Sequence, residues 1–398
     1  MNPKCLLYMQ TSRFLIYIAN EKHVLLEGLI MLKHYKILNY NFKLLIMVIA
    51  LAVIGIIAVG SAEESLQSRQ IAGFAVGVFL MLVLSLFDYS VILSFSWLIY
   101  ILNLVLLTLV IFMGDESNNA QRWLDIGGIR FQPSEIAKIF IILFLSYFIS
   151  KHQKKLNTFK YITLTVILFA LPAALVLKQP DLSTTIVICI IFAVIMFIGG
   201  ISWKVIVGFL AVAIPALVIL ITLILQPDQK IIPEYQKNRI VAFFHKEEFA
   251  NSLGYQQEYS VMAIGSGQLT GKGYKNNQIS SVKNANFIAE QQTDFIYAVI
   301  GEEFGFVGAS VVVILLMLIS IECFLVARRA NDMAGTLIAA GVGAQLGFQG
   351  FINIGVVTYL LPNTGLPLPF LSYGLTSLIS SFIGIGFVLN VGLQCKQK

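Results

Sequence analysis

The chain is organised as long apolar runs separated by short polar connections. Ten apolar segments stand out, over residues 44–60, 71–87, 91–113, 133–150, 160–178, 182–200, 203–225, 295–326, 334–361 and 367–394. About 18–20 consecutive apolar residues suffice to cross a bilayer as a helix. The pattern therefore predicts an all-α fold: a polytopic membrane protein with about ten transmembrane helices.

Lysine and arginine are concentrated in alternate connections, and this asymmetry predicts the orientation in the membrane. The basic residues concerned are Lys151, Lys154, Lys155, Lys160, Lys204, Arg328, Arg329, Lys396 and Lys398. All of them lie on the cytoplasmic side if both termini are cytoplasmic. Residues 226–294 then form one large extracytoplasmic loop between the seventh and eighth helices.

Residues 1–30 are interpreted as an N-terminal extension to a single membrane domain over residues 31–398. The extension is mixed and weakly apolar, and its run FLIYIA is too short for the core of a signal peptide. Met31 opens a basic stretch directly before the first apolar segment. We therefore expect translation to begin at Met31.

Composition excludes several other classes of protein. Charged residues make up only 12% of the 398-residue chain and hydrophobic residues 58%, whereas a soluble domain is about 25% charged. The net charge of +6 is not gathered into one basic patch, so no nucleic acid partner is expected. The four cysteines lie far apart without a CxxC pair, which predicts neither a disulfide framework nor a zinc site.

The most informative stretch is QQTDFIYAVIGEEFGFVG, where the long polar loop ends and an apolar run begins. Asp294 lies at this junction, at the rim of a predicted membrane helix. An acid in such a position is costly and is a functional hypothesis by default. The alternative is that Thr293 or Asp294 only caps the helix by accepting backbone N–H bonds.

A second candidate is the pair formed by Glu135 and Lys138 at the start of the fourth segment. Pro133 suits the first turn of a helix, and a spacing of three places the carboxylate and the ammonium on one helix face. The two side chains form either a neutralised structural pair or part of a polar cavity that faces a charged substrate.

Two further charged residues are expected near the outer surface. Arg122, together with Arg130, is suited to binding phosphate, although an arginine here also fits simple snorkelling to the membrane surface. Asp181 lies in the tight turn before the sixth segment. It either caps that helix or projects toward the same cavity as Asp294.

Two outer loops contain glycine and proline patterns. The run IGSGQLTGKG over residues 264–273 fails the Walker pattern because Gly273 follows Lys272 where serine or threonine is required, so close backbone packing or a turn is expected. Residues 235–249 mix aromatic and basic side chains, as in a short interfacial helix. In LLPNTGLPLPFLSYG, Ser372 either offers a hydrogen bond to a wet cavity or belongs to a rigid turn.

These polar features sort to the outer face, which favours an outward-facing active or binding site. Five ordered motifs also resemble the signatures of the SEDS family, to which RodA, FtsW and SpoVE belong. They read FQPSEIAK, KQPDL, GYQ followed by AIGSG…GKG, TDFIYAVIGEEFGFVG, and LPNTGLPLPFLSYG. The resemblance extends from about residue 40 to the C-terminus and is greatest to RodA. The departures are SYGLT for the usual SYGGS, with Leu375 for a glycine, and Tyr359 for a common glycine.

The resemblance implies a peptidoglycan glycosyltransferase in the cytoplasmic (inner) membrane. Such an enzyme polymerises lipid II, an undecaprenyl-pyrophosphate disaccharide-pentapeptide, outside the membrane, together with a class B penicillin-binding protein that supplies the transpeptidase. The essential aspartate of the family falls on Asp294, the acid and base of its fourth helix on Glu135 and Lys138, and the KQPD acid on Asp181.

We expect an inverting transfer in which Asp294 acts as the general base. The leaving pyrophosphate needs positive charge, from Arg122, Lys138 or a divalent cation such as Mg²⁺ or Mn²⁺, and the sequence does not choose among them. The rival readings are a lipid II flippase or other transporter, a scaffold for a transpeptidase, and a polymerase of another lipid-linked sugar. A division or sporulation paralogue with the same chemistry is the alternative to a role in elongation.

Overall fold

The protein is described by a computed structural model over residues 40–117, 120–126, 129–224, 237, 241, 243–244, 254–275 and 290–395. The predicted extension 1–30, the start at Met31, most of the loop 226–294 and nearly all of the interfacial helix 235–249 lie outside these residues. Those expectations stay predictions.

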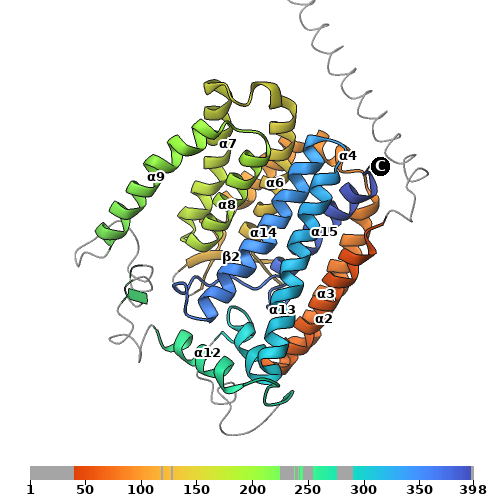
Figure 1. The fold of residues 1–398 in the computed structure, drawn as a ribbon, viewed down its shortest axis with the longest axis vertical. Helices are drawn as coiled ribbons and strands as arrows, with labels where there is room; N and C mark the ends of the chain where they lie inside the picture. The colour runs from red at the N-terminus through yellow and green to blue at the C-terminus, as the bar shows by residue number, and fades with distance from the viewer. Residues whose placement is uncertain are drawn as a thin grey trace, which may run out of the picture.

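Each of the ten apolar segments contains helix, and in the last segment the helix begins only at Leu375 (Figure 1). The third segment is divided into a short and a long helix, and α12 lies within the long outer loop. The helices are α2 (Phe42–Ala62), α3 (Glu64–Leu86), α4 (Tyr89–Ser94), α5 (Ser96–Met113), α6 (Pro133–His152), α7 (Phe159–Lys178), α8 (Leu182–Ile198), α9 (Trp203–Ile224), α12 (Tyr255–Ser266), α13 (Ile296–Arg329), α14 (Met333–Val357) and α15 (Leu375–Leu393), with a 3₁₀ turn η3 at Gln153–Lys155.

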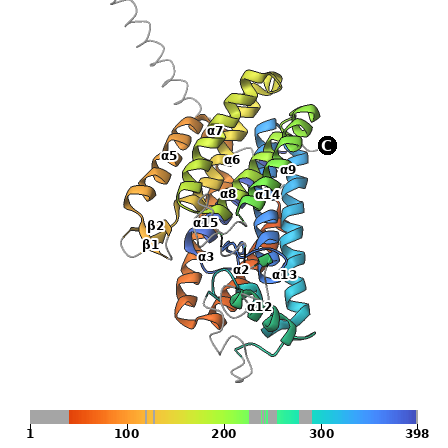
Figure 2. The ribbon, with the colours of Figure 1, turned by 90° about the vertical axis from the view of Figure 1, so that its left-hand side faces the viewer.

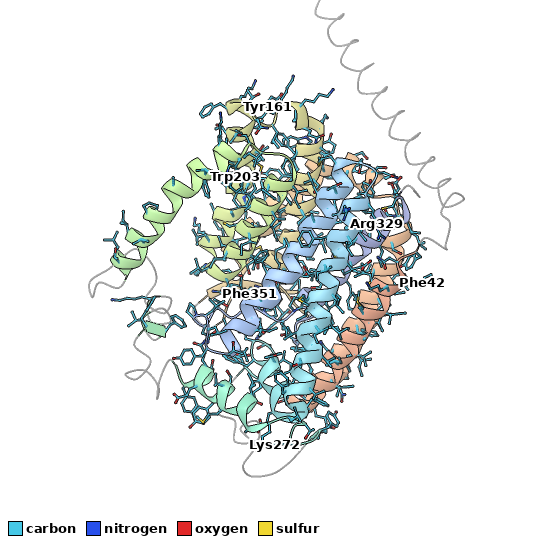
Figure 3. All side chains as sticks on the ribbon, viewed as in Figure 1. Phe42, Tyr161, Trp203, Lys272, Arg329 and Phe351 are labelled. Carbon is cyan, nitrogen blue, oxygen red and sulfur yellow. The ribbon has the colours of Figure 1, made fainter. Side chains whose placement is uncertain are left out.

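The apolar character of these helices confirms the prediction of a polytopic membrane protein. Eight helices in the described part of the chain are long and apolar enough to cross a membrane, and α8 is a shorter apolar helix. Figure 3 shows Tyr161 and Lys272 at opposite ends of the bundle. The predicted cytoplasmic turn after α6 and the outer 264–273 loop therefore lie at opposite ends. The total of ten spans and the sidedness stay predictions.

A small antiparallel sheet, which the apolar pattern does not predict, lies in the connection between α5 and α6. Its strands are β1 (Asp115–Ser117), β2 (Ala120–Ile126) and β3 (Ile129–Phe131), in the order β1-β2-β3. In the β2–β3 pair, Leu124 lies opposite Phe131. Figure 2 shows β1 and β2 below α5 at one edge of the bundle. The sheet presents Arg122 from β2 to the bundle.

The centre of the bundle is made by α6, α14 and α15, whose apolar stretches are each 78% buried. α13 packs along α14 and α2, and α15 packs along α3. The outer helices α3 and α5 keep large apolar side chains exposed, among them Phe79, Leu98 and Phe112, as expected for surfaces in contact with lipid. α9 leads away from the other helices at the left of Figure 1.

Candidate active site

The chain enters α13 through a tight turn that contains Asp294. The N-cap position of α13 is Phe295, which makes no side-chain capping bond. The Thr293 hydroxyl donates instead to the Glu290 carboxylate at 3.0 Å, and the N–H of Phe295 donates to the Glu290 carbonyl at 3.2 Å. Neither residue of the predicted cap therefore occupies the N-cap position. Asp294 is half-buried one residue before it.

The 362–373 turn packs directly against this entry to α13. The Ser372 hydroxyl donates to the Thr293 carbonyl at 2.6 Å and accepts from the N–H of Leu368 at 2.7 Å. The N–H of Tyr373 donates to the Gln292 carbonyl at 2.8 Å. Ser372 is buried, so the structure places it as a tether between two backbone segments. This arrangement matches the rigid-turn alternative.

Glu135 and Lys138 form a completely buried ion pair on α6. The Lys138 ammonium lies 2.9 and 3.0 Å from the two Glu135 carboxylate oxygens and 2.8 Å from Oε1 of Gln349 on α14. An ammonium has three N–H donors, and this side chain has an acceptor for each. The relative exposure of the Lys138 side chain is 0%. The geometry therefore favours the neutralised structural pair over a lysine that faces an open surface.

Asp181 is the N-cap of α8. Its carboxylate accepts from the backbone N–H of Thr184 at 3.1 Å and from the Thr184 hydroxyl at 2.9 Å. The same carboxylate also lies 3.3 Å from the Gln132 amide and from the Ser134 hydroxyl at the start of α6. The structure therefore matches the capping alternative, and Asp181 also joins the N-terminal ends of α6 and α8.

Arg122 lies beside Asp181. Its Nε donates to the Gln179 carbonyl at 3.3 Å, another guanidinium N–H donates to the Pro180 carbonyl, and Nη1 is 4.0 Å from the Asp181 carboxylate. The guanidinium thus fixes the turn before α8. Because the Arg122 side chain is still 20% exposed, it is more accessible than Lys138.

The 264–273 loop lies on the first turns of α13, which is kinked at Gly305, where φ is 62°. The N–H groups of Lys272 and Gly273 donate to the carbonyls of Glu302 and Glu303 at 2.9 and 3.0 Å. A Cβ on Gly271 would overlap the Glu303 carbonyl. Close backbone packing is therefore the role of Gly271, and of Gly267, where a Cβ would overlap the Gly301 carbonyl, as predicted for this loop.

Ion pairs hold the same loop in place. Lys272 Nζ lies 2.7 Å from the Glu302 carboxylate. Lys275 Nζ lies 2.9 Å from the Glu64 carboxylate, and this hydrogen bond raises the pKa of Lys275. At the other end of the bundle, Glu322 of α13 is paired with Lys43 at 3.0 Å. This inner acid thus serves to join α2 and α13.

Two buried amides were missed by the sequence reasoning. Gln349 binds Lys138, and Asn353 donates to the carbonyl of Asp294 at 2.7 Å. Both lie on α14 and are 1% exposed. The available signal was polar residues at a spacing of four inside the apolar segment 334–361, namely Gln345, Gln349 and Asn353. Such polar groups are expensive within a membrane and are usually retained for a reason.

The described residues hold no group of three or more His, Cys, Asp or Glu side chains placed to bind a metal. A divalent cation at this site would have to take most of its ligands from substrate phosphate and water. The cation stays a prediction.

Comparisons with known proteins agree with the fold and identify the family. The FtsW/RodA/SpoVE family, described as cell cycle proteins, matches residues 31–397. "Peptidoglycan glycosyltransferase MrdB" of Escherichia coli K12 is 34% identical over 357 residues, which are 89% of this chain and 94% of that protein. "Probable peptidoglycan glycosyltransferase FtsW" of Geobacter metallireducens is 31% identical over 377 residues, 90% and 96% of the two chains.

Solved structures show the same fold. A chain from a structure of a peptidoglycan synthase complex that coordinates polymerization and crosslinking superposes with a TM-score of 0.74 at 28% identity, covering 89% of this chain and 97% of the other. The rod shape determining protein RodA of Thermus thermophilus superposes with a TM-score of 0.66 at 27% identity, covering 90% and 98%.

The apolar helix bundle and its likeness to known membrane proteins define a multi-pass protein of the bacterial inner membrane. The sequence and structure matches identify its class as that of membrane glycosyltransferases. The chain belongs to the FtsW/RodA/SpoVE family, the SEDS family that its motifs resemble.

Proposed function

We propose that this protein polymerises lipid II into glycan strands of peptidoglycan at the outer face of the cytoplasmic membrane, and that it does so during cell elongation. The observation that carries the proposal is the half-buried Asp294 at the entry to α13, tethered through its neighbour Thr293 to the 362–373 turn. The likeness to MrdB and to the rod shape determining protein RodA supports elongation. The relatives are named glycosyltransferases, so a flippase is not favoured.

The reaction is a single displacement in which Asp294 is the general base. The acceptor sugar hydroxyl loses its proton to the carboxylate as its oxygen bonds to the anomeric carbon of the donor, and the bond from that carbon to the lipid pyrophosphate breaks. General-base catalysis contributes about 10²–10⁴-fold in rate. Attack by the hydroxyl from the opposite side inverts the anomeric centre, through an oxocarbenium-like transition state by analogy with glycoside hydrolysis.

The leaving pyrophosphate is stabilised by positive charge. Lys138 is buried and bound to Glu135 and Gln349, so its role is to hold α6 and α14 together beneath the site. The partly exposed Arg122 and a divalent cation, Mg²⁺ or Mn²⁺, remain as sources of charge. A class B penicillin-binding protein crosslinks the product, in keeping with the related chain that was solved in a peptidoglycan synthase complex.

The decisive experiment uses purified protein and labelled lipid II without nucleotide, with glycan chains separated on a gel. Wild-type protein makes polymer, and Asp294→Asn makes none while it is inserted and folded normally. Lys154→Ala is the matched control, because Lys154 is exposed at the opposite end of the bundle. Near-normal polymer from Asp294→Asn, or movement of lipid II across vesicles without polymer, overturns the proposal.

The elongation role is tested in cells. Rod-shaped bacteria depleted of their own elongation polymerase become round, and expression of this chain restores the rod shape. Rescue of a division polymerase instead, seen as the shortening of filaments, places the protein in division.

A further inference from the structure

One face of α14 carries three buried amides. Gln345, Gln349 and Asn353 are spaced by four residues, and each is 1% exposed. Residues at this spacing lie on the same side of a helix, about 6 Å apart along its axis. A buried amide is unfavourable unless it is hydrogen-bonded, so the partners of each amide indicate what this face does.

Asn353 uses its amide nitrogen on two separate backbone segments. Nδ2 donates to the carbonyl of Asp294 at 2.7 Å and to the carbonyl of Leu366 at 2.6 Å. An amide nitrogen has two hydrogens, so both are used. Asn353 therefore binds the entry to α13 and the 362–373 turn at the same time.

Gln349 makes the equivalent link one helical turn further along α14. Its Oε1 accepts from Lys138 at 2.8 Å, and its Nε2 donates to the carbonyl of Pro367 at 2.9 Å. The two amides thus bind consecutive carbonyls, those of Leu366 and Pro367. Asn353 also binds the backbone carbonyl of Asp294, and Gln349 also binds the ammonium of Lys138.

We infer that this face of α14 sets the distance between the Asp294 segment and the Glu135–Lys138 pair, with Asn353 and Gln349 as positioning residues. Both bind through the side chains of one rigid helix, so their two attachments are held about 6 Å apart along α14. Precise placement of reacting groups is worth a large rate factor, and a misplacement of about 1 Å can cost about 100-fold. This inference rests on the proposed function of Asp294.

The third amide provides a matched control. Gln345 lies on the same face of α14 and is equally buried, and its Oε1, like Oδ1 of Asn353, has no hydrogen-bond partner among the described residues. Unlike Asn353, Gln345 makes no bond there to the Asp294 segment or to the 362–373 turn. A buried polar group without a partner carries an unrecovered desolvation cost, so its replacement by an apolar side chain of similar size should be nearly neutral or stabilising. Gln345→Leu should therefore retain the activity of the wild type.

The test compares Asn353→Leu with Gln345→Leu in the full-length protein, at a temperature well below both melting temperatures. Lipid II polymerisation is measured per folded protein over a range of lipid II concentrations and of pH. For Asn353→Leu we expect kcat to fall by about 10- to 100-fold with KM within about threefold. The acid limb of the pH profile, which reports the general base, should also shift. If the leucine variant does not accumulate, Asn353→Ser is used instead, because it removes the amide but keeps a polar side chain.

Two results overturn the inference. One is an unchanged kcat per folded protein with only a lower melting temperature, which would make Asn353 merely structural. The other is an equal loss in Asn353→Leu and Gln345→Leu. The proposed function fails separately, if the wild-type protein makes no polymer or if Asp294→Asn makes a normal amount.

Discussion

The buried pair on α6 allows a prediction that separates stability from chemistry. Removal of one partner of a buried ion pair leaves an uncompensated charge and costs about 3–5 kcal/mol. Glu135 and Lys138 are 2% and 0% exposed, so solvent does not screen them. Lys138→Met also deprives Gln349 of its donor. At about 2 °C per kcal/mol, we expect the melting temperature to fall by about 6–10 °C.

The double variant Glu135→Leu/Lys138→Met provides the decisive comparison. Replacing both members of a buried pair by apolar groups is often neutral or stabilising, so the double variant should melt within a few degrees of the wild type. Glu135→Leu alone should lose as much as Lys138→Met, because it leaves a buried ammonium. The assay is thermal unfolding in detergent, followed by lipid II polymerisation at a temperature where all variants are folded.

We expect the double variant to recover most of its stability, because no buried charge is left unpaired, and to keep a reduced but clear activity, because it still lacks the Lys138–Gln349 bond that joins α6 to α14. A double variant that is as stable as the wild type but inactive would refute this expectation, because the charges themselves would then be needed by the substrate. Lys154→Ala, at an exposed site, should change neither quantity.

Three further variants test the tethers around the site. Asp181→Ala removes the N-cap of α8 and a carboxylate near Arg122. The loss of a cap typically lowers the free energy of unfolding by about 1–2 kcal/mol, and we expect at least this loss in thermal unfolding. Gly271→Val should prevent the outer loop from packing on Glu303, which limited proteolysis would detect as faster cleavage within residues 254–275. Ser372→Ala leaves a buried N–H without its acceptor and should cost about 1–3 kcal/mol, with polymerisation reduced more than the folded fraction. An unchanged melting temperature or cleavage rate in any of these would contradict the corresponding contact.

The sequence predicts the helices well because a membrane permits few alternatives to a helix. Each of the ten apolar segments contains helix. The small sheet was missed because β1 and β3 are only three residues long and are defined by pairing with β2. The position of Asp294 was predicted from the change in polarity at residue 294. The bond between Asn353 and this segment could not be predicted. The amide binds a backbone carbonyl 59 residues away, and because every residue has a backbone carbonyl, the sequence does not indicate which one is bound.

The prolines of the 362–373 turn explain how irregular backbone is accommodated beside Asp294. Non-helical backbone at membrane depth is tolerated only if its polar groups are satisfied within the protein. Proline has no N–H, so three prolines remove three donors that would each need a partner. Five backbone groups of the turn are bound: the carbonyls of Thr364, Leu366 and Pro367 by Ser183, Asn353 and Gln349, and the N–H groups of Leu368 and Tyr373 by Ser372 and the Gln292 carbonyl. These bonds tie the turn to α8, α14 and the entry to α13, and so hold the backbone beside the proposed catalytic carboxylate of Asp294.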